Sequence, residues 1–235
     1  MSQWKNASML VAAFLSAMAS FVRADSPPPR PRIFSSEWGT HAFKVLESKV
    51  TGSYKGLLFT LEADGKERVL WSGTLVNVPQ RVFVSEDGKR VVTIETYGSS
   101  GEEHVVVVYD DKGKVLADYK KLEELLTKEE LQFMAQGITS RMWTPYAAFA
   151  FSSTVKPKQF LITVKRADLF TAALQRLKEV PTKLRIDNPK EREDAISRNE
   201  KRIEEVQSAL RDLDGQNERV IKIDLESGKL LGDVD

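Results

Sequence analysis

The chain of 235 residues contains no cysteine. This absence excludes disulfide bonds, thiol nucleophiles and thiolate metal sites, so packing alone must hold the fold together. It also excludes a lipid attached through cysteine after an export signal. Histidine is scarce, since only His41 and His104 are present. The formal net charge is +1, which gives no sign of the strongly basic surface typical of nucleic-acid binding.

The N-terminal residues have the pattern of an export signal. Lys5 supplies a positive charge, residues 7–22 are uncharged and largely apolar, and Ala24 suits peptidase cleavage. An uncleaved anchor is the alternative, but the run is shorter than the roughly 20 residues that span a bilayer. We therefore predict a signal peptide at residues 1–24 of a periplasmic or secreted bacterial protein, with no stable membrane span after cleavage. Residues 25–32 are rich in proline and predict an extended linker, or alternatively a docking motif for a partner.

A four-strand unit at residues 82–119 organises the rest of the chain. Its apolar runs are separated by turn residues, including Asp87 and Gly88, which favour a hairpin. Residues 105–108 are all valine, which predicts a strand covered on both faces. A weaker copy occupies residues 33–71.

A third copy is split by an insertion. Residues 149–164 supply its first two strands and residues 219–231 its last two, while the insertion at about 167–218 has helical periodicity. We therefore predict a mainly β protein. Residues 33–235 should form three four-strand, blade-like units with an α-helical hairpin arm.

Residues that typically begin and end helices mark the helical segments. Thr127 with Glu130 forms a capping box and predicts a helix that ends at Gly137. Asp168 is predicted to cap the next helix, and Pro181 to end it.

The last helix is predicted to start at Asn188, with Pro189 in its first turn, and to reach Asp214 before Gly215. A coiled-coil seam at spacings of three and four follows one face of it: Ile196, Asn199, Ile203, Val206, Leu210 and Leu213. Asn199 is the polar position, which can fix the register. We predict an antiparallel hairpin that projects from the sheet and can be deleted without unfolding it.

The succession of strand, Ser-Glu-Asp-Gly-Lys, strand and Val-Val-Val-Val-Tyr-Asp-x-x-Gly-Lys resembles the blades of β-propeller repeat proteins. It is also similar to a group of uncharacterised exported bacterial proteins built from such units. The resemblance covers residues 33–126 and, more weakly, 149–164 and 219–231, and it implies no catalytic residue. Because a closed propeller needs at least four blades, three units imply an open ring, a ring completed by another chain, or a sandwich-like stack.

Motifs for catalysis are weak. No nucleophile elbow, phosphate loop or His-Glu-x-x-His motif occurs. Ser153 and Lys156 match the Ser-x-x-Lys of penicillin-recognising enzymes, but no Lys-Thr-Gly follows. His104 follows two glutamates, so a metal site is conceivable, but a solvated loop histidine is the simpler interpretation. Turn chemistry, and not calcium binding, explains the acidic turns at Asp64, Asp87 and Asp110.

The sequence predicts a non-enzymatic protein without cofactor or metal. We expect it to bind a protein partner or a second copy of the chain. The predicted contact residues are Ile196, Asn199, Ile203, Val206 and Leu210 in the helical arm, and Arg141 and Trp143 in the link before the third unit. The alternative is a cell-envelope glycan-binding protein or an envelope enzyme with an aromatic face, formed by Trp38, Trp71, Tyr97, Trp143 and Tyr146. Core packing is the competing explanation for these aromatic residues.

Overall fold

The structure is a computed structural model. It divides the chain into two compact units, residues 1–30 and 31–235. The described residues are 32–47, 53–95, 104–136, 141–154, 156–183 and 186–232, and for 181–183 they comprise the backbone only. The predicted signal peptide therefore lies outside the described residues. Within these ranges no helix has the length and apolarity needed to cross a membrane.

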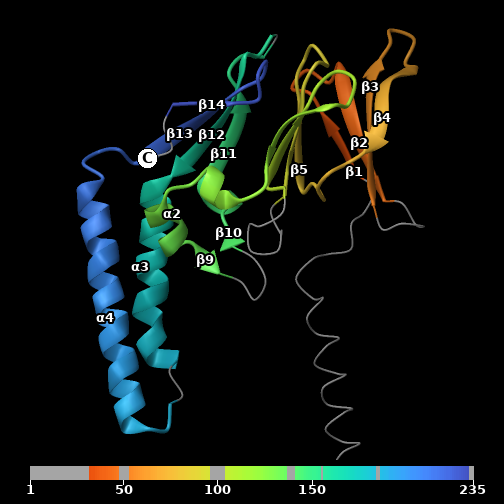
Figure 1. Ribbon diagram of the computed structural model, residues 1–235. Helices are drawn as coiled ribbons and strands as arrows, with labels where there is room; N and C mark the ends of the chain where they lie inside the picture. Colours follow the sequence, from red (N-terminus) through yellow and green to blue (C-terminus); the bar gives the residue numbers. More distant parts are fainter. Residues whose placement is uncertain are drawn as a thin grey trace, which may run out of the picture. The chain divides into compact units, whose positions relative to one another are not determined.

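The described residues form three four-stranded antiparallel sheets (Figure 1). The first sheet contains β1 (Arg32–Ser35), β2 (His41–Glu47), β3 (Tyr54–Leu61) and β4 (Glu67–Thr74), in that order. The second contains β5 (Arg81–Val84), β6 (Val91–Ile94), β7 (Val106–Tyr109) and β8 (Val115–Tyr119). The third contains β11 (Ala147–Phe151), β12 (Gln159–Lys165), β13 (Glu218–Asp224) and β14 (Leu230–Leu231). The predicted fold class, an open arrangement of three four-strand units with a helical region, is confirmed.

The third sheet is interrupted in sequence but continuous in space. β12 and β13 pair along their whole length, from Gln159 opposite Asp224 to Lys165 opposite Glu218. The two helices α3 (Arg166–Lys183) and α4 (Pro189–Asp212) lie between these strands in the sequence. They run side by side in opposite directions (Figure 1).

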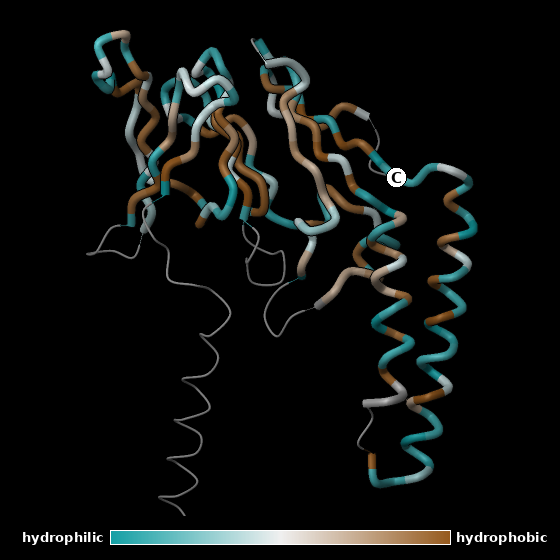
Figure 2. The backbone as a smooth tube through the Cα atoms, turned by 180° about the vertical axis from the view of Figure 1, so that it is seen from behind, coloured by the Kyte–Doolittle hydropathy of each residue, from teal (hydrophilic) through white to brown (hydrophobic). Residues whose placement is uncertain are grey.

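The second sheet is buried on both faces, as the run of valines predicts. Val91, Val107 and Tyr109 pack toward the first sheet in a cluster with Phe43 and Trp71. The opposite face packs against the third sheet and the helices, through Val92, Ile94, Val106 and Val108. Figure 2 shows hydrophobic residues concentrated along the strands, whereas α4 is largely hydrophilic. Alternate side chains of one strand therefore fill two different cores.

Polar contacts also join the sheets. The hydroxyl of Tyr119 in β8 donates to the carbonyl oxygen of Gly228 (2.7 Å), beside the third sheet. Arg90 Nε donates to the carbonyl oxygen of Leu225 at the end of β13 (2.7 Å). Burial, and after it the nearby charge of Glu124, raises the pKa of Tyr119 to about 12. This hydroxyl therefore stays protonated and remains a donor across the physiological pH range.

The aspartates in the turns act as predicted, through their own backbone. Asp110 Oδ1 accepts hydrogen bonds from the backbone N–H of Lys112 (2.9 Å) and of Lys114 (2.8 Å). Gly113, in the same turn, has a φ of 78°, which a side chain would disfavour. The same contact with the N–H two residues later recurs in three other turns, at Asp64, Asp87 and Asp224. These carboxylates are therefore turn formers.

Helix α2 (Lys128–Phe133) begins as predicted but ends early. The capping box is present, because Thr127 Oγ1 accepts from Glu130 N (3.2 Å) and Glu130 Oε2 accepts from Thr127 N (3.0 Å). The predicted end at Gly137 is wrong, since Ala135–Gln136 forms the short strand β9, which pairs with β10 (Arg141–Met142). Strand pairing here overrides the local helix signal.

Two predicted boundaries of α3 are also wrong. The helix begins at Arg166, directly after β12, so Asp168 lies in the first turn and is not the cap. The helix also continues past Pro181 to Lys183. At the start of α4, by contrast, Asn188 caps the helix as predicted: its Oδ1 accepts from Lys190 N (3.0 Å) and Glu191 N (3.4 Å).

The base of the hairpin belongs to the core. Leu169, Phe170 and Ala173 of α3 are buried in the same cluster as residues of the second and third sheets, together with Val206 and Ala209 of α4 and its C-cap residue Leu213. Deletion of the whole hairpin would expose this cluster. No deletion has tested the prediction that the arm is dispensable for folding, and these buried contacts argue against it.

Candidate functional site

The seam of α4 is occupied within the chain. Asn199 and Val206 are buried, and Ile196, Ile203 and Leu210 are half-buried. The hairpin aligns α4 with α3, and Ile203 and Leu210 pack against the core cluster that contains Leu169 and Leu177. Four of the five seam residues that we expected to contact a partner therefore pack within the chain: Asn199, Ile203, Val206 and Leu210.

Asn199 has a specific role at this contact. Its Nδ2 donates to the carbonyl oxygen of Leu177 in α3 (2.9 Å), and the residue is 6% exposed. In an α-helix this oxygen would accept from the N–H of residue 181, but Pro181 has none. The asparagine therefore satisfies the acceptor that the proline leaves open. This contact fixes one helix against the other, as expected for a polar seam residue.

The remaining two predicted contact residues lie in different surroundings. Trp143 is 2% exposed, with its ring 5.3 Å from that of Phe149 in an edge-on arrangement. Arg141 Nη1 donates to Glu123 Oε1 (2.7 Å), and its side chain is partly exposed. Arg141 lines a cavity together with Arg202 of α4, whereas Trp143 is part of the core.

The predicted aromatic face is not assembled among the described residues. Trp71 packs against Phe43 and Tyr109 in the first core cluster, with ring centroids 5.3 and 5.8 Å away. Tyr146 is half-buried and its hydroxyl accepts from Arg176 (3.1 Å). Trp38 alone among the three tryptophans of this face is exposed (64%), and Tyr97 lies outside the described residues.

His104 is not the freely solvated loop histidine that the sequence suggested. Its Nδ1 lies 2.8 Å from Oδ1 and 2.9 Å from Oδ2 of Asp118, and its side chain is 31% exposed. Within the described ranges, no group of three or more His, Asp or Glu side chains is placed to hold a metal ion.

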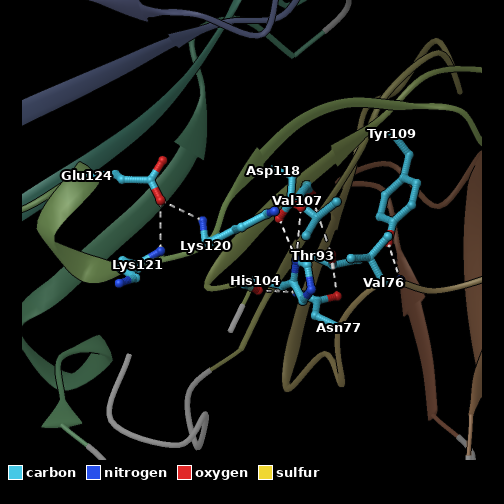
Figure 3. A network of polar contacts seen from close by, with 10 residues as sticks. All are labelled: Val76, Asn77, Thr93, His104, Val107, Tyr109, Asp118, Lys120, Lys121 and Glu124. Carbon is cyan, nitrogen blue, oxygen red and sulfur yellow. Dashed lines mark hydrogen bonds and ion pairs between the residues drawn. The ribbon is translucent and has the colours of Figure 1, made fainter. Parts of the chain in front are cut away.

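The histidine belongs to a network that ties the first sheet to the second (Figure 3). Asn77, in the linker after β4, donates through Nδ2 to the carbonyl oxygen of His104 (2.9 Å) and accepts at Oδ1 from Thr93 Oγ1 (2.9 Å). The hydroxyl of Tyr109 accepts from Val76 N in the same linker (3.0 Å). Because Asn77 and Thr93 are both buried, these bonds hold the linker in place.

Two buried carboxylates also connect elements, a role that no sequence pattern indicated. Glu130 is fully buried and bonds to Arg219 Nε in β13 (2.9 Å). Glu86 is 9% exposed and accepts hydrogen bonds from Trp38 N and from Thr40 Oγ1 (2.6 Å), in the loop between β1 and β2. Burial alone would raise the pKa of Glu86, but the bonds from Thr40 and Trp38 outweigh it and hold this pKa below its usual value.

The first sheet has an apolar outer face. Cross-strand register places Ile33 opposite Lys44, Lys44 opposite Leu57, and Val69 opposite Phe59. Ala42, Lys44 and Phe59 also lie on this face; Ala42 and Phe59 are buried, and Lys44 Nζ lies 4.5 Å from the centre of the Phe59 ring. The more exposed apolar side chains of the face define outer face 1: Ile33, Leu46, Leu57, Leu61 and Val69. Four of them are 40–65% exposed, and Leu57 is half-buried. The other side of the sheet faces the second sheet, so outer face 1 has no partner within the described residues.

The third sheet has a corresponding surface. Thr163 lies opposite both Ala148 and Val220, and Lys222 lies opposite both Leu161 and Leu231. These residues define outer face 3: Ala148, Ala150, Leu161, Thr163, Val220, Lys222 and Leu231. Val220 is 46% and Leu231 43% exposed. This stack of three sheets therefore ends on both sides in a sheet face with exposed apolar side chains.

Sequence reasoning missed both outer faces because it judged strands one at a time. A signal existed in Leu57, Leu58 and Phe59, since consecutive apolar residues predict a strand covered on both faces. Among the described residues, only the middle sheet is covered on both faces. No protein-family model matches this chain, and the search of curated proteins found no match.

Proposed function

We propose that this protein is an exported, non-enzymatic assembly module in which a second copy of the chain completes the open stack of sheets. The observation that carries the proposal is the pair of uncovered apolar faces at the two ends of the stack. Groups of exposed apolar side chains on one sheet face are typical of surfaces that become buried in an interface.

The repeat indicates how two copies would fit. The cross-strand pair Phe34 and Phe43 in the first sheet corresponds to Phe83 and Val92 in the second. The first pair packs toward the second sheet, and Phe83 packs toward the third, against the ring of Phe160 (5.3 Å). Each sheet thus turns the same side toward the sheet that follows it. Continuation of this rule places outer face 3 of one copy against outer face 1 of the other.

The count of sheets favours two copies. Closed propellers contain about 4 to 8 blades, and two chains with three sheets each would supply six. When two different faces of the same chain form the contact, the copies form a closed ring if the rotation from one copy to the next divides a full turn evenly. Otherwise they form an open filament. The helical hairpin emerges from the β12–β13 connection, so it leaves both outer faces uncovered. Since the seam of α4 is already occupied by α3, the outer faces are better candidates for assembly than the arm.

The test is the mass of the purified exported chain in solution, measured by light scattering on a size-exclusion column. We expect a dimer for the wild type, and a monomer for Val69→Glu on outer face 1 and for Val220→Glu on outer face 3. Arg68→Glu places a carboxylate next to Val69 on a 62% exposed position, at the cost of an exposed ion pair with Glu62, and should remain dimeric.

A mixture of the two glutamate variants separates this arrangement from others. Each variant retains the intact face that the other has lost, so the mixture should form a heterodimer through one remaining interface. A monomeric wild type would overturn the proposal. So would a dimer that Val69→Glu disrupts and Val220→Glu does not, because that result means that outer face 1 binds itself.

A further inference from the structure

A cavity of about 590 Å³ lies between the helical hairpin and the segment that joins the second sheet to the third. Its walls come from α2, α3, α4, β9 and β10. Pockets for small molecules typically measure about 300–1,000 Å³. The volume is therefore sufficient for a ligand much larger than a single ion or water molecule.

One part of the lining is apolar. Phe133 and Met134, at the end of α2, are 5% and 6% exposed, and Leu177 of α3 is 8% exposed. Leu131 and Val180 add half-buried apolar side chains to the same lining. This surface suits a hydrocarbon group, because its burial removes apolar area from water.

The other part of the lining carries four cationic side chains, Lys128, Arg141, Arg176 and Arg202, and one carboxylate, Glu123. Arg141 is paired with Glu123 (2.7 Å). Arg176 is held by two neutral acceptors, the carbonyl oxygen of Phe133 (2.7 Å) and the hydroxyl of Tyr146 (3.1 Å), so its charge is not compensated there.

Lys128 and Arg202 have neither a hydrogen bond nor an ion pair within the described part of the chain, and both are exposed. Four positive charges and one negative charge leave the described lining at +3. Arg202 lies on α4 and Lys128 on α2, so two separate helices each contribute a cationic side chain to the same cavity. An anion there would gain charge-assisted hydrogen bonds without displacing an existing partner from either side chain.

We propose that this cavity binds an anionic amphiphile, a molecule with one carboxylate or phosphate group and a short hydrocarbon chain. The head group contacts Lys128 and Arg202, and the hydrocarbon chain lies against Phe133, Met134 and Leu177. This site is separate from outer faces 1 and 3, so it does not depend on assembly of the chain into dimers.

The test is isothermal titration calorimetry on the purified chain with octanoate, octyl phosphate, 1-octanol and acetate as probes. We expect octanoate or octyl phosphate to bind measurably, and 1-octanol and acetate to bind at least about tenfold more weakly, since each lacks one of the two features. Preference between the two anions distinguishes a carboxylate ligand from a phosphate ligand.

The variants Lys128→Gln and Arg202→Gln remove one unpaired cation each. Each should weaken binding by about three- to tenfold, which is the range of a single charge-assisted contact. Lys201→Gln removes the adjacent charge on α4 outside the cavity lining and should leave the affinity unchanged. Failure of both anions to bind, equal binding of 1-octanol, or an equal loss in Lys201→Gln would overturn the proposal.

Discussion

The contact between Asn199 and the carbonyl oxygen of Leu177 predicts a specific coupling with Pro181. In Asn199→Ala the buried carbonyl oxygen loses its donor, and the proline offers no N–H in its place. An unsatisfied buried polar group costs about 1–3 kcal/mol. We therefore expect the free energy of unfolding to fall by about 2 kcal/mol.

Pro181→Ala restores the missing N–H at the position four residues after Leu177, where helix geometry directs it to the same oxygen. In that background Asn199→Ala should cost about 1 kcal/mol less, because the carbonyl keeps a partner. The four proteins of this double-mutant cycle are compared by urea unfolding monitored by circular dichroism. With a slope of about 2 kcal/mol per molar urea, the single Asn199→Ala variant should shift the midpoint by about 1 M.

Ser197→Ala is the matched control, since Ser197 is an exposed position of α4 on the opposite side of the seam. It should change the stability by less than about 0.5 kcal/mol. If Asn199→Ala has the same cost with and without Pro181, the asparagine does not act through the Leu177 carbonyl. That result would refute the explanation that the Asn199 contact allows α3 to continue through Pro181.

Two further predictions concern the buried carboxylates. Glu130→Ala leaves Arg219 without its buried partner and removes one of the two capping-box bonds of α2, so it should destabilise the chain by about 3–5 kcal/mol, measured as the loss in unfolding free energy. An effect below about 1 kcal/mol would contradict the bridging role. The pKa of Glu86 is lower in the folded state than in the unfolded state. The stabilising effect of Glu86 should therefore be complete at a pH above its pKa in the unfolded chain, and it should disappear as the pH falls through its pKa in the folded chain. The stability difference between wild type and Glu86→Gln should therefore shrink between about pH 6 and pH 3 in urea titrations, and a constant difference would count against the assignment.

Much of the local structure follows from short-range chemistry and was predictable. The turns at Asp87 and Asp110 depend on an aspartate that binds its own backbone and on a glycine with positive φ. The helix starts at Thr127 and Asn188 depend on a side-chain oxygen that reaches an N–H two or three residues away. Such interactions involve only residues that are close in the sequence, so the sequence alone is sufficient to predict these turns and helix starts.

The helix ends were less predictable because they depend on distant partners. Pro181 interrupts a hydrogen bond that Asn199 replaces from another helix, and the helix therefore continues. The end of α2 is set by the pairing of Ala135 with Met142 in a separate strand. In both cases a tertiary contact supplies the energy that local preference alone would not provide.

The sequence by itself determined the repeat: three strand-rich units, with the last one opened to admit two helices, because periodic apolar runs and turn residues are local properties. Only the tertiary structure decided which apolar faces are covered. Trp143, Asn199 and Val206 are buried by neighbours remote in sequence, while Ile33, Val69 and Val220 remain exposed at the ends of the stack. Exposure depends on what packs against a surface, and the sequence of a single strand or helix does not show which element packs against it.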